Sequence, residues 1–446
     1  MGCSPIIPRK HAWLGRCGLA GCGMADGRCI AHFRPRNFGS GWKMSSKNQP
    51  TPPDQRQAVL SQRRNLKMAE SAHAYVRGST VKFYEWLEKS SGKVPDGPPV
   101  WICGDCHVGN LGPVANAKGR IGIQIRDVDQ TVVGNPAHDL IRLGLSLATA
   151  ARGSDLPGVT TALMLERMIE GYMMTLDGEL GGDAVRKRPS VVRVGMRQAI
   201  GRTWKHLAKD RIKDIRPTIP LGKRFWPLTE EERAAVEELF AKDQVRRLVT
   251  ALHSRDDNDR IELLDAAYWV KGCSSLGRLR IAVLLGVGEG HYDEGGLSLI
   301  DIKEAVQAAA PRAAKNGMPR DNAERVVTGA QNLSPYLGDR MRPARLLDRA
   351  VFLRELLPQD IKLDFDHLTR EEATRVAFYL AAVVGKAHAR QMDEATRKSW
   401  RGELARNRTK SLDAPSWLWS SIVDLIVGHE AAYLEHCRRY AERPDV

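Results

Sequence analysis

Apolar residues recur at every third or fourth position along much of the chain, the spacing of an amphipathic helix. The pattern is clearest at 139–151 and 371–390, where one face is almost entirely apolar. The same spacing predicts further helices at 56–87, with a break at 74–78, at 160–176, 230–252 and 259–270, and in the tail up to residue 442.

A second pattern, short apolar runs of alternating polarity, predicts β-strands. Ile121, Ile123 and Ile125 alternate with smaller or polar residues. Beyond residue 270, similar runs are separated by turns rich in glycine, which predicts strands at 278–285, 297–303, 344–348 and 350–356.

The two patterns together predict an α+β protein, and 446 residues allow two or three core-forming units. Residues 1–50 lack either periodicity, and we expect a disordered tail there. The remaining units are expected to be a helical lobe at 51–265, a β-rich lobe at 266–360, and C-terminal helices at 361–446 that pack on the helical lobe.

The composition is that of a globular protein, with 42% hydrophobic and 27% charged residues. No run of eighteen apolar residues occurs, so no membrane span is expected. Eight cysteines at irregular spacing do not form a disulfide scaffold in a chain of this length, which favours a reducing cytoplasm.

Positive charge is concentrated in one stretch. The chain carries a net charge of +15, and 186–224 holds thirteen Lys or Arg against two acids, Asp210 and Asp214. This stretch is either a solvated helical face or a surface for an anion, such as phosphate, an acidic substrate or nucleic acid.

The stretch richest in candidate chemistry is 101–139. Asp105 and Asn110 lie five apart in a loop bounded by glycines, and Asp127 follows the strand that contains Ile125. A hairpin would bring Asp127 back beside the other two residues. Three hard oxygen ligands would then converge, which suits Mg²⁺ with bound phosphates.

These residues resemble the catalytic centre of protein-kinase-like and aminoglycoside-phosphotransferase-like enzymes, in which a G-D-x-H-x-G-N loop precedes a second Asp and a G-x-P-x-x-D-L segment. The resemblance implies that Asp105 is the catalytic base and that Asn110 and Asp127 bind the metal. Asp139 would brace the loop. Cys103 departs from the pattern, which usually has His before the first glycine. Asp129 is either a second metal contact or a structural carboxylate.

A loop of small residues at 270–277 precedes the predicted strand 278–285, and Lys303 ends the strand after that one. A glycine-containing loop of this kind can bind phosphates through its backbone N–H groups. These features resemble the nucleotide lobe of kinases and imply ATP binding by Gly272, Ser274, Ser275, Gly277 and Lys303. Kinases pair this lysine with a glutamate on the following helix. Glu324 is the candidate and Glu304 a weaker one, although Asp321 and Glu324 also have capping-box spacing.

Residues 60–395 resemble an uncharacterised bacterial family, family twenty-two fifty-two of the domains of unknown function. The implied fold is a two-lobed kinase-like one, with the motifs in circularly permuted order. We therefore expect Lys303 to face Asp127 across one cleft, and the 371–390 helix to pack beside the segment that leads into Asp105.

The implied activity is ATP- and Mg²⁺-dependent phosphoryl transfer to an unidentified small molecule or protein. A pseudokinase that binds nucleotide, a nucleotidyl transferase and a basic nucleic-acid-binding protein without catalysis are the alternatives. The run 103–107, CGDCH, also matches the attachment pattern of c-type haem, but this reading leaves the carboxylates unexplained.

Overall fold

A computed structural model describes residues 51–440 except 91, 179–187, 205, 207–216, 252–254, 257, 274, 289–295, 313–316, 366 and 407–412. The chain divides into two units, Met1–Gln49 and Pro50–Val446, and the fold below is that of the second. The tail expected at 1–50 lies outside the described residues.

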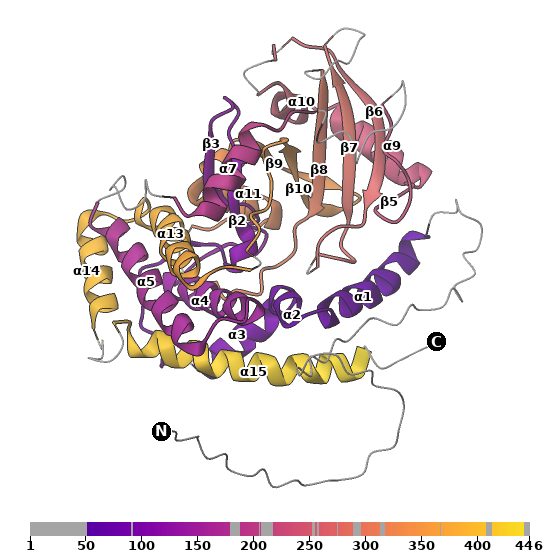
Figure 1. The fold of residues 1–446 in the computed structure, drawn as a ribbon. Coiled ribbons are helices and arrows are strands. Elements are labelled where there is room, and N and C mark those ends of the chain that lie inside the picture. Colours follow the sequence, from indigo (N-terminus) through magenta and orange to yellow (C-terminus); the bar gives the residue numbers. More distant parts are fainter. Residues whose placement is uncertain are drawn as a thin grey trace, which may run out of the picture. The chain divides into compact units, whose positions relative to one another are not determined.

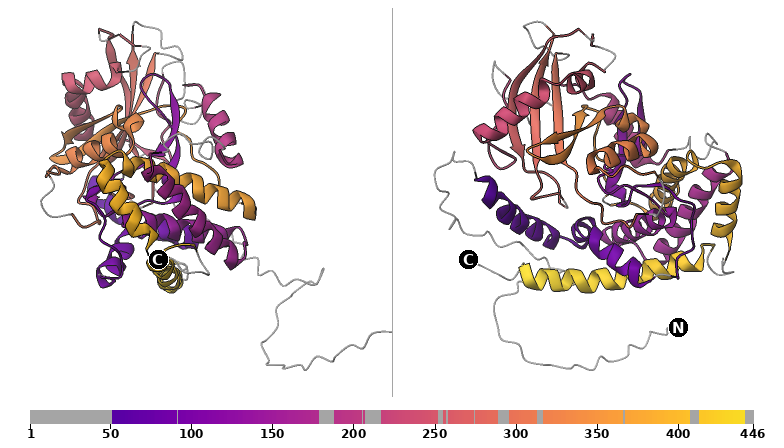
Figure 2. Two further views of the ribbon diagram at one scale, coloured as in Figure 1. Left: turned by 90° about the vertical axis from the view of Figure 1, so that its left-hand side faces the viewer. Right: turned by 180° about the vertical axis from the view of Figure 1, so that it is seen from behind.

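Helices from both ends of this unit pack together. They are α1 (Pro53–Ala69), α2 (Ala72–Gly78), α3 (Thr80–Lys89), α4 (Pro136–Gly153), α5 (Gly158–Leu176), α7 (Ser190–Ile200), α13 (Arg370–Ala389), α14 (Glu394–Ala405) and α15 (Ser416–Tyr440). Figure 1 shows α13 along α5, and Figure 2 shows α15 passing beneath α1 and α2, which it contacts.

Two glycines allow the close approach of α5 and α13. A Cβ on Gly171 would lie 2.2 Å from the carbonyl oxygen of Phe378, and one on Gly385 would lie 2.4 Å from Thr175 Oγ1. Neither site has space for a larger side chain, so the two backbones meet almost directly. The apolar faces of both helices and of α4 form one buried core.

The β-rich part is a six-stranded antiparallel sheet in the order β5-β6-β7-β8-β10-β9. Its strands are β5 (Phe225–Trp226), β6 (Ile261–Trp269), β7 (Arg280–Val287), β8 (Leu297–Glu304), β9 (Met341–Leu346) and β10 (Arg349–Leu356). Apolar residues of α9 (Glu230–Phe240), α10 (Asp243–Thr250) and α1 cover one face. α11 (Asn322–Leu333) and α12 (Pro335–Gly338) connect β8 to β9.

The α+β class and the four strands expected beyond residue 270 are confirmed. The helix predicted at 259–270 is wrong, because this segment is β6. Its residues alternate between the two faces of the sheet, with Tyr268 in one core cluster and Trp269 in the other. The boundary expected at residue 265 therefore falls inside a strand.

The break expected at 74–78 is also misplaced. That segment is α2, and the chain breaks on either side of it, since the Ser71 hydroxyl caps the new helix by accepting from Ala74 N. A serine N-cap satisfies a backbone donor that would otherwise be unpaired.

Two small sheets hold the stretch at 100–134 in place. β1 (Val100–Ile102) pairs with β4 (Val132–Gly134), and β2 (Leu111–Ala115) pairs with β3 (Ile121–Ile125). A short 3₁₀ turn, Val108–Asn110, leads into β2. The hairpin expected between Asn110 and Asp127 is thus present. Among the described helices, none combines the length and apolar character needed to cross a bilayer.

Candidate functional site

The loop that carries Asp105 is held in place by backbone hydrogen bonds to Asp139, which lies in the first turn of α4. The two carboxylate oxygens of Asp139 accept from Cys103 N at 2.7 Å and Gly104 N at 3.0 Å. His388 Nε2 of α13 lies 3.2 Å from the same carboxylate, and its Nδ1 lies 2.9 Å from Tyr172 Oη. The bracing contact expected for Asp139 is therefore present, and the 371–390 helix supports it.

The Asp105 carboxylate is nearly buried, at 7% side-chain exposure, and faces a buried arginine. Arg142 donates from Nε at 3.0 Å and Nη2 at 2.9 Å, both to Asp105 Oδ1. Oδ2 has His107 Nε2 at 3.9 Å. Burial raises the pKa of Asp105, and Arg142 only partly opposes that rise. The carboxylate is therefore oriented through one oxygen, with the other outside the arginine contact.

Asn110 is tied to the same loop. Its side-chain Nδ2 donates to the backbone carbonyl oxygen of Asp105 at 2.9 Å, and its backbone carbonyl oxygen accepts from Arg126 N at 2.7 Å. Because the amide nitrogen is engaged, the amide oxygen is oriented away from the Asp105 carbonyl and remains an acceptor for a ligand.

Lys303, near the end of β8, links the six-stranded sheet to the segment that carries Asp127 and Asp129. Its Nζ lies 3.2 Å from both carboxylate oxygens of Asp127 and 3.1 Å from Asp129 Oδ2. The lysine and Asp129 side chains are 4% and 9% exposed, whereas Asp127 is 44% exposed. Lys303 and Asp127, which were expected to face each other, form an ion pair, and Asp127 is the most exposed member of this cluster.

The charges in this cluster shift the two carboxylates in opposite directions. Burial alone would raise the pKa of Asp127, but Lys303 and then Arg280 more than reverse this and hold it below its usual range. Burial and the neighbouring Asp127 charge raise the pKa of Asp129. Asp127 is thus the carboxylate that stays ionised at lower pH.

Several residues of the cluster were not found from the sequence. Arg280 donates to both oxygens of Asp301 at 2.8 and 2.5 Å, in the same sheet. Arg325 of α11 is fully buried and donates to the carbonyl oxygens of Thr131 and Asp129. Arg142 lies three positions after Asp139 on the same helix, but nothing in the sequence distinguishes it from an ordinary helical arginine.

Glu324 does not pair with Lys303. It lies exposed at the start of α11 beside a cavity that Arg342 also lines, while the ammonium of Lys303 has two aspartates as partners. The side chain of Asp321 caps the helix by accepting from Glu324 N at 3.1 Å. The helix instead directs the following residue, Arg325, toward the site. Glu304 also points elsewhere, since its Oε2 accepts from Leu279 N at 2.8 Å.

The predicted phosphate loop connects β6 to β7. Gly272 and Gly277 both have positive φ, 103° and 95°, which only glycine adopts without strain. Ser275 is buried, and Ser274 lies outside the described residues. Lys67 Nζ of α1 donates to the carbonyl oxygen of Gly272 at 2.9 Å.

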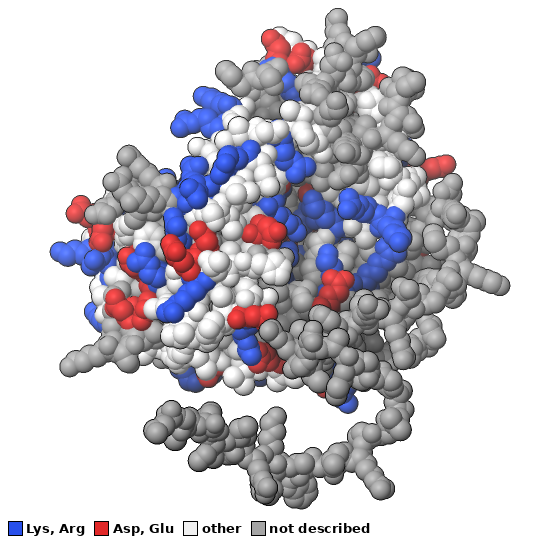
Figure 3. Space-filling model, in the orientation of Figure 1, with Lys and Arg blue, Asp and Glu red and all other residues white. Residues whose placement is uncertain are grey.

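A cavity of about 540 Å³ opens beside this loop. Arg63 and Lys67 of α1 line it together with Arg224. Trp269 contributes from the end of β6, and Gly272 from the loop that follows. Arg224 belongs to the basic stretch 186–224, of which the structure describes 188–204, 206 and 217–224. In Figure 3, Lys and Arg side chains gather near the lower ends of β5 to β7, above α1.

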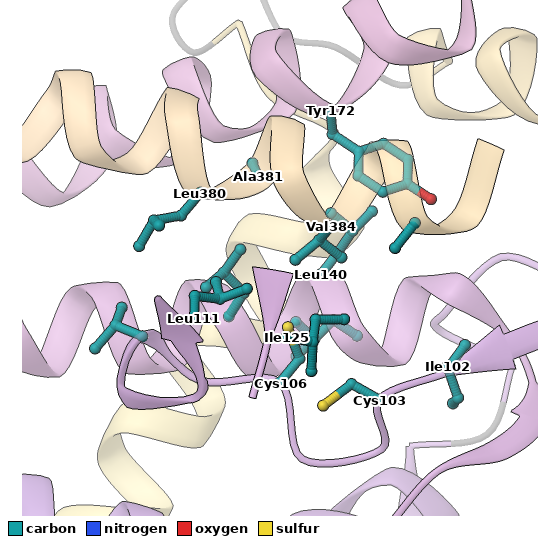
Figure 4. Close-up of a cluster of buried hydrophobic side chains, with 14 of the residues drawn as sticks. Ile102, Cys103, Cys106, Leu111, Ile125, Leu140, Tyr172, Leu380, Ala381 and Val384 are labelled. Atoms are coloured by element: carbon teal, nitrogen blue, oxygen red, sulfur yellow. The ribbon is translucent and has the colours of Figure 1, made fainter. Parts of the chain in front are cut away.

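Cys103 and Cys106 lie in the core rather than in the site. Figure 4 shows both among Leu140, Ile125 and neighbouring apolar side chains, and both thiols are free and buried. The hydrogen bond with Cys106, and then burial, raise the pKa of Cys103 well above its usual value. Inert packed thiols fit this environment better than haem attachment does.

The fit of the site to Mg²⁺ depends on its oxygen donors. In the described part of the chain, no group of three or more His, Cys, Asp or Glu side chains is arranged to hold a metal ion. Asp127 and Asn110 supply one carboxylate and one amide oxygen. This donor set suits a magnesium ion that is held jointly with phosphate oxygens, not one in a cage made by protein alone.

Residues 56–439 match the model of a protein family described as "Uncharacterized protein conserved in bacteria (DUF2252)". No curated protein and no solved structure matches the chain.

Proposed function

The chain belongs to this family of uncharacterised bacterial proteins, and we propose that it is an ATP- and Mg²⁺-dependent kinase-like phosphotransferase. The proposed fold has two lobes, the helices and the six-stranded sheet, in circularly permuted order. The acceptor of the phosphoryl group is a small molecule or a protein.

One observation carries the proposal. Lys303, on the third strand of the β6-β7-β8 meander, reaches Asp127 across 176 positions of sequence and also contacts Asp129. A buried lysine beside a partly exposed aspartate, next to a glycine-containing loop, is an arrangement that binds phosphates and a divalent cation. A purely structural ion pair would not need the exposed carboxylate.

Each residue has a role in this proposal. Lys303 and the Gly272–Gly277 loop hold the nucleotide phosphates, and Asn110 and Asp127 hold magnesium. When bound, magnesium neutralises charge on the phosphates. Oδ2 of Asp105 takes the proton of the acceptor hydroxyl. As it does so, the hydroxyl oxygen forms a bond to the γ-phosphorus, the bond from that phosphorus to ADP breaks, and ADP leaves. A pKa raised by burial suits a carboxylate to this work.

The test uses the full chain with γ-labelled ATP, Mg²⁺ and a cell metabolite extract. We expect a labelled product and ADP with the native chain, and neither with Asp127→Asn. Release of pyrophosphate with AMP on the acceptor would instead indicate a nucleotidyl transferase. A salt-dependent gel shift with nucleic acid, without thermal stabilisation by ATP, would overturn the proposal in favour of nucleic-acid binding.

A further inference from the structure

We infer that the acceptor carries an oxyanion, a phosphate or carboxylate group, which Arg77 and Lys362 bind beside Asn110 and Asp127. This inference deepens the proposed function and rests on it. The residues concerned come from α2 and from the segment that follows β10, not from the loop and strand assigned to the nucleotide.

Arg77 reaches the Asp105 loop from the end of α2. Arg77 Cζ lies 3.5 Å, and His107 Nδ1 3.2 Å, from the point where a Cβ on Gly109 would stand. Neither His107 Nδ1 nor Arg77 Nε, both buried, has a hydrogen-bond partner within the described structure. A guanidinium and an imidazole nitrogen thus face one spot, one residue before Asn110.

Two more cations lie close to the start of β2, which follows that turn. Arg126 Cδ lies 2.8 Å, and the Ile361 carbonyl oxygen 3.2 Å, from the point where a Cβ on Gly112 would stand. The segment that bears Lys362 therefore runs past Arg126. Arg126 Nε is buried without a partner, and Lys362 is exposed, with no hydrogen bond or ion pair to any described residue.

These cations repel one another in the absence of a ligand. Partial burial, and then the charges of Arg77, Arg126 and Lys67, lower the pKa of Lys362. An anion bound among them would relieve this repulsion, because each cation would gain an opposite charge.

The geometry favours the acceptor over the nucleotide as the source of this anion. The nucleotide phosphates are assigned to Lys303 and the Gly272–Gly277 loop, on the sheet side of Asp127. Arg77 approaches from the helical side, where Asp105 lies and where an acceptor hydroxyl must arrive. Arginine binds phosphate and carboxylate through paired hydrogen bonds, which would orient that hydroxyl.

Inorganic phosphate is the probe, measured by calorimetry and thermal shift with the full chain saturated with Mg²⁺ and a non-hydrolysable ATP analogue. We expect phosphate to bind, and the double variant Arg77→Gln, Lys362→Gln to weaken its binding by about tenfold or more, as expected if two charge-assisted contacts are lost. Nucleotide affinity should remain within about twofold of the native value.

Two variants act as controls. Lys118→Gln with Arg120→Gln removes the same charge from the exposed β2–β3 turn and should leave phosphate affinity unchanged. Arg224→Gln removes a cation from the 540 Å³ cavity. If Arg224→Gln alone abolished phosphate binding, the anion site would be that cavity and the inference would be wrong.

The remaining outcomes also decide the matter. Phosphate that binds only when the analogue is absent would assign Arg77 and Lys362 to the nucleotide. Phosphate affinity unchanged in the double variant would show an adventitious ion only. If the chain bound no nucleotide, the proposed function would fail, whereas phosphate binding lost in the double variant would still support an anion site at these residues.

Discussion

His388 Nε2 lies 3.2 Å from Asp139 Oδ2, although 249 positions separate the two residues. The contact joins α13 to the first turn of α4, and Asp139 in turn holds the backbone of the Asp105 loop. The C-terminal part of the unit thereby supports a loop near its beginning.

Asp139→Asn should destabilise the fold and reduce turnover. Asparagine offers one acceptor oxygen where the carboxylate offers two, so one of the buried N–H groups of Cys103 and Gly104 loses its partner. The expected cost is about 1–3 kcal/mol of unfolding free energy, measured by urea denaturation. Asp96→Asn, on the exposed loop before β1, is the control; an equal effect of both variants would contradict the bracing role.

Asp127→Asn should abolish ATP turnover and weaken Mg²⁺-dependent nucleotide binding while leaving stability almost unchanged. The side chain is 44% exposed, and Lys303 keeps Asp129 as a buried partner. Turnover, nucleotide titration and thermal melting measure the three quantities. Unchanged turnover would remove Asp127 from the mechanism.

Asp105→Asn should lower the transfer rate by about 10²–10⁴-fold with nearly unchanged ATP affinity. A collapse of affinity with a normal residual rate would instead identify Asp105 as a ligand or structural residue.

The same residue predicts a pH dependence. A base acts only when deprotonated, so kcat/KM of the native chain should rise with pH through the pKa of Asp105. Burial raises that pKa, which moves this limb above the usual aspartate value of about 3.9. The limb should be absent from the profile of Asp105→Asn; if it persists there, another group titrates.

Gly171→Ala should destabilise the fold by about 1–3 kcal/mol, because the added methyl would collide with the backbone of α13. Gly402→Ala is the matched control in α14, where a Cβ meets nothing within 4 Å. That change should stabilise the fold by roughly 0.5–1 kcal/mol, since alanine favours a helix interior. Chemical denaturation of both variants measures the difference, and equal shifts would contradict the close packing of α5 and α13.

The sequence predicted those parts of the site that depend on local spacing. The loop with Asp105 and Asn110, the hairpin before Asp127 and the brace at Asp139 each follow from a motif or a short strand. The prediction of a helix in place of β6 was wrong because both faces of the sheet are covered from residue 266 onward, so the strand is continuously buried there and lacks the alternation of polarity that marks a half-buried strand.

The arginines that complete the site could not be predicted from the sequence. Arg142 and Arg325 lie on apolar helices, and a buried arginine has no pattern that distinguishes it from an exposed one. Glu324 was predicted to pair with Lys303, but helix register relative to the sheet depends on packing and does not follow from spacing alone. The side chain that faces inward is therefore known only once α11 is in place.

The glycine-lined seam between α5 and α13 also imposes a delay during synthesis. Leu176 and Ala389 end the two helices, so 389 − 176 = 213 residues must be added after α5 before its partner is complete. At typical elongation rates this takes roughly 10–40 s. During that interval the part of the α5 surface that α13 covers in the finished fold stays exposed on the nascent chain, where a ribosome-associated chaperone can bind it.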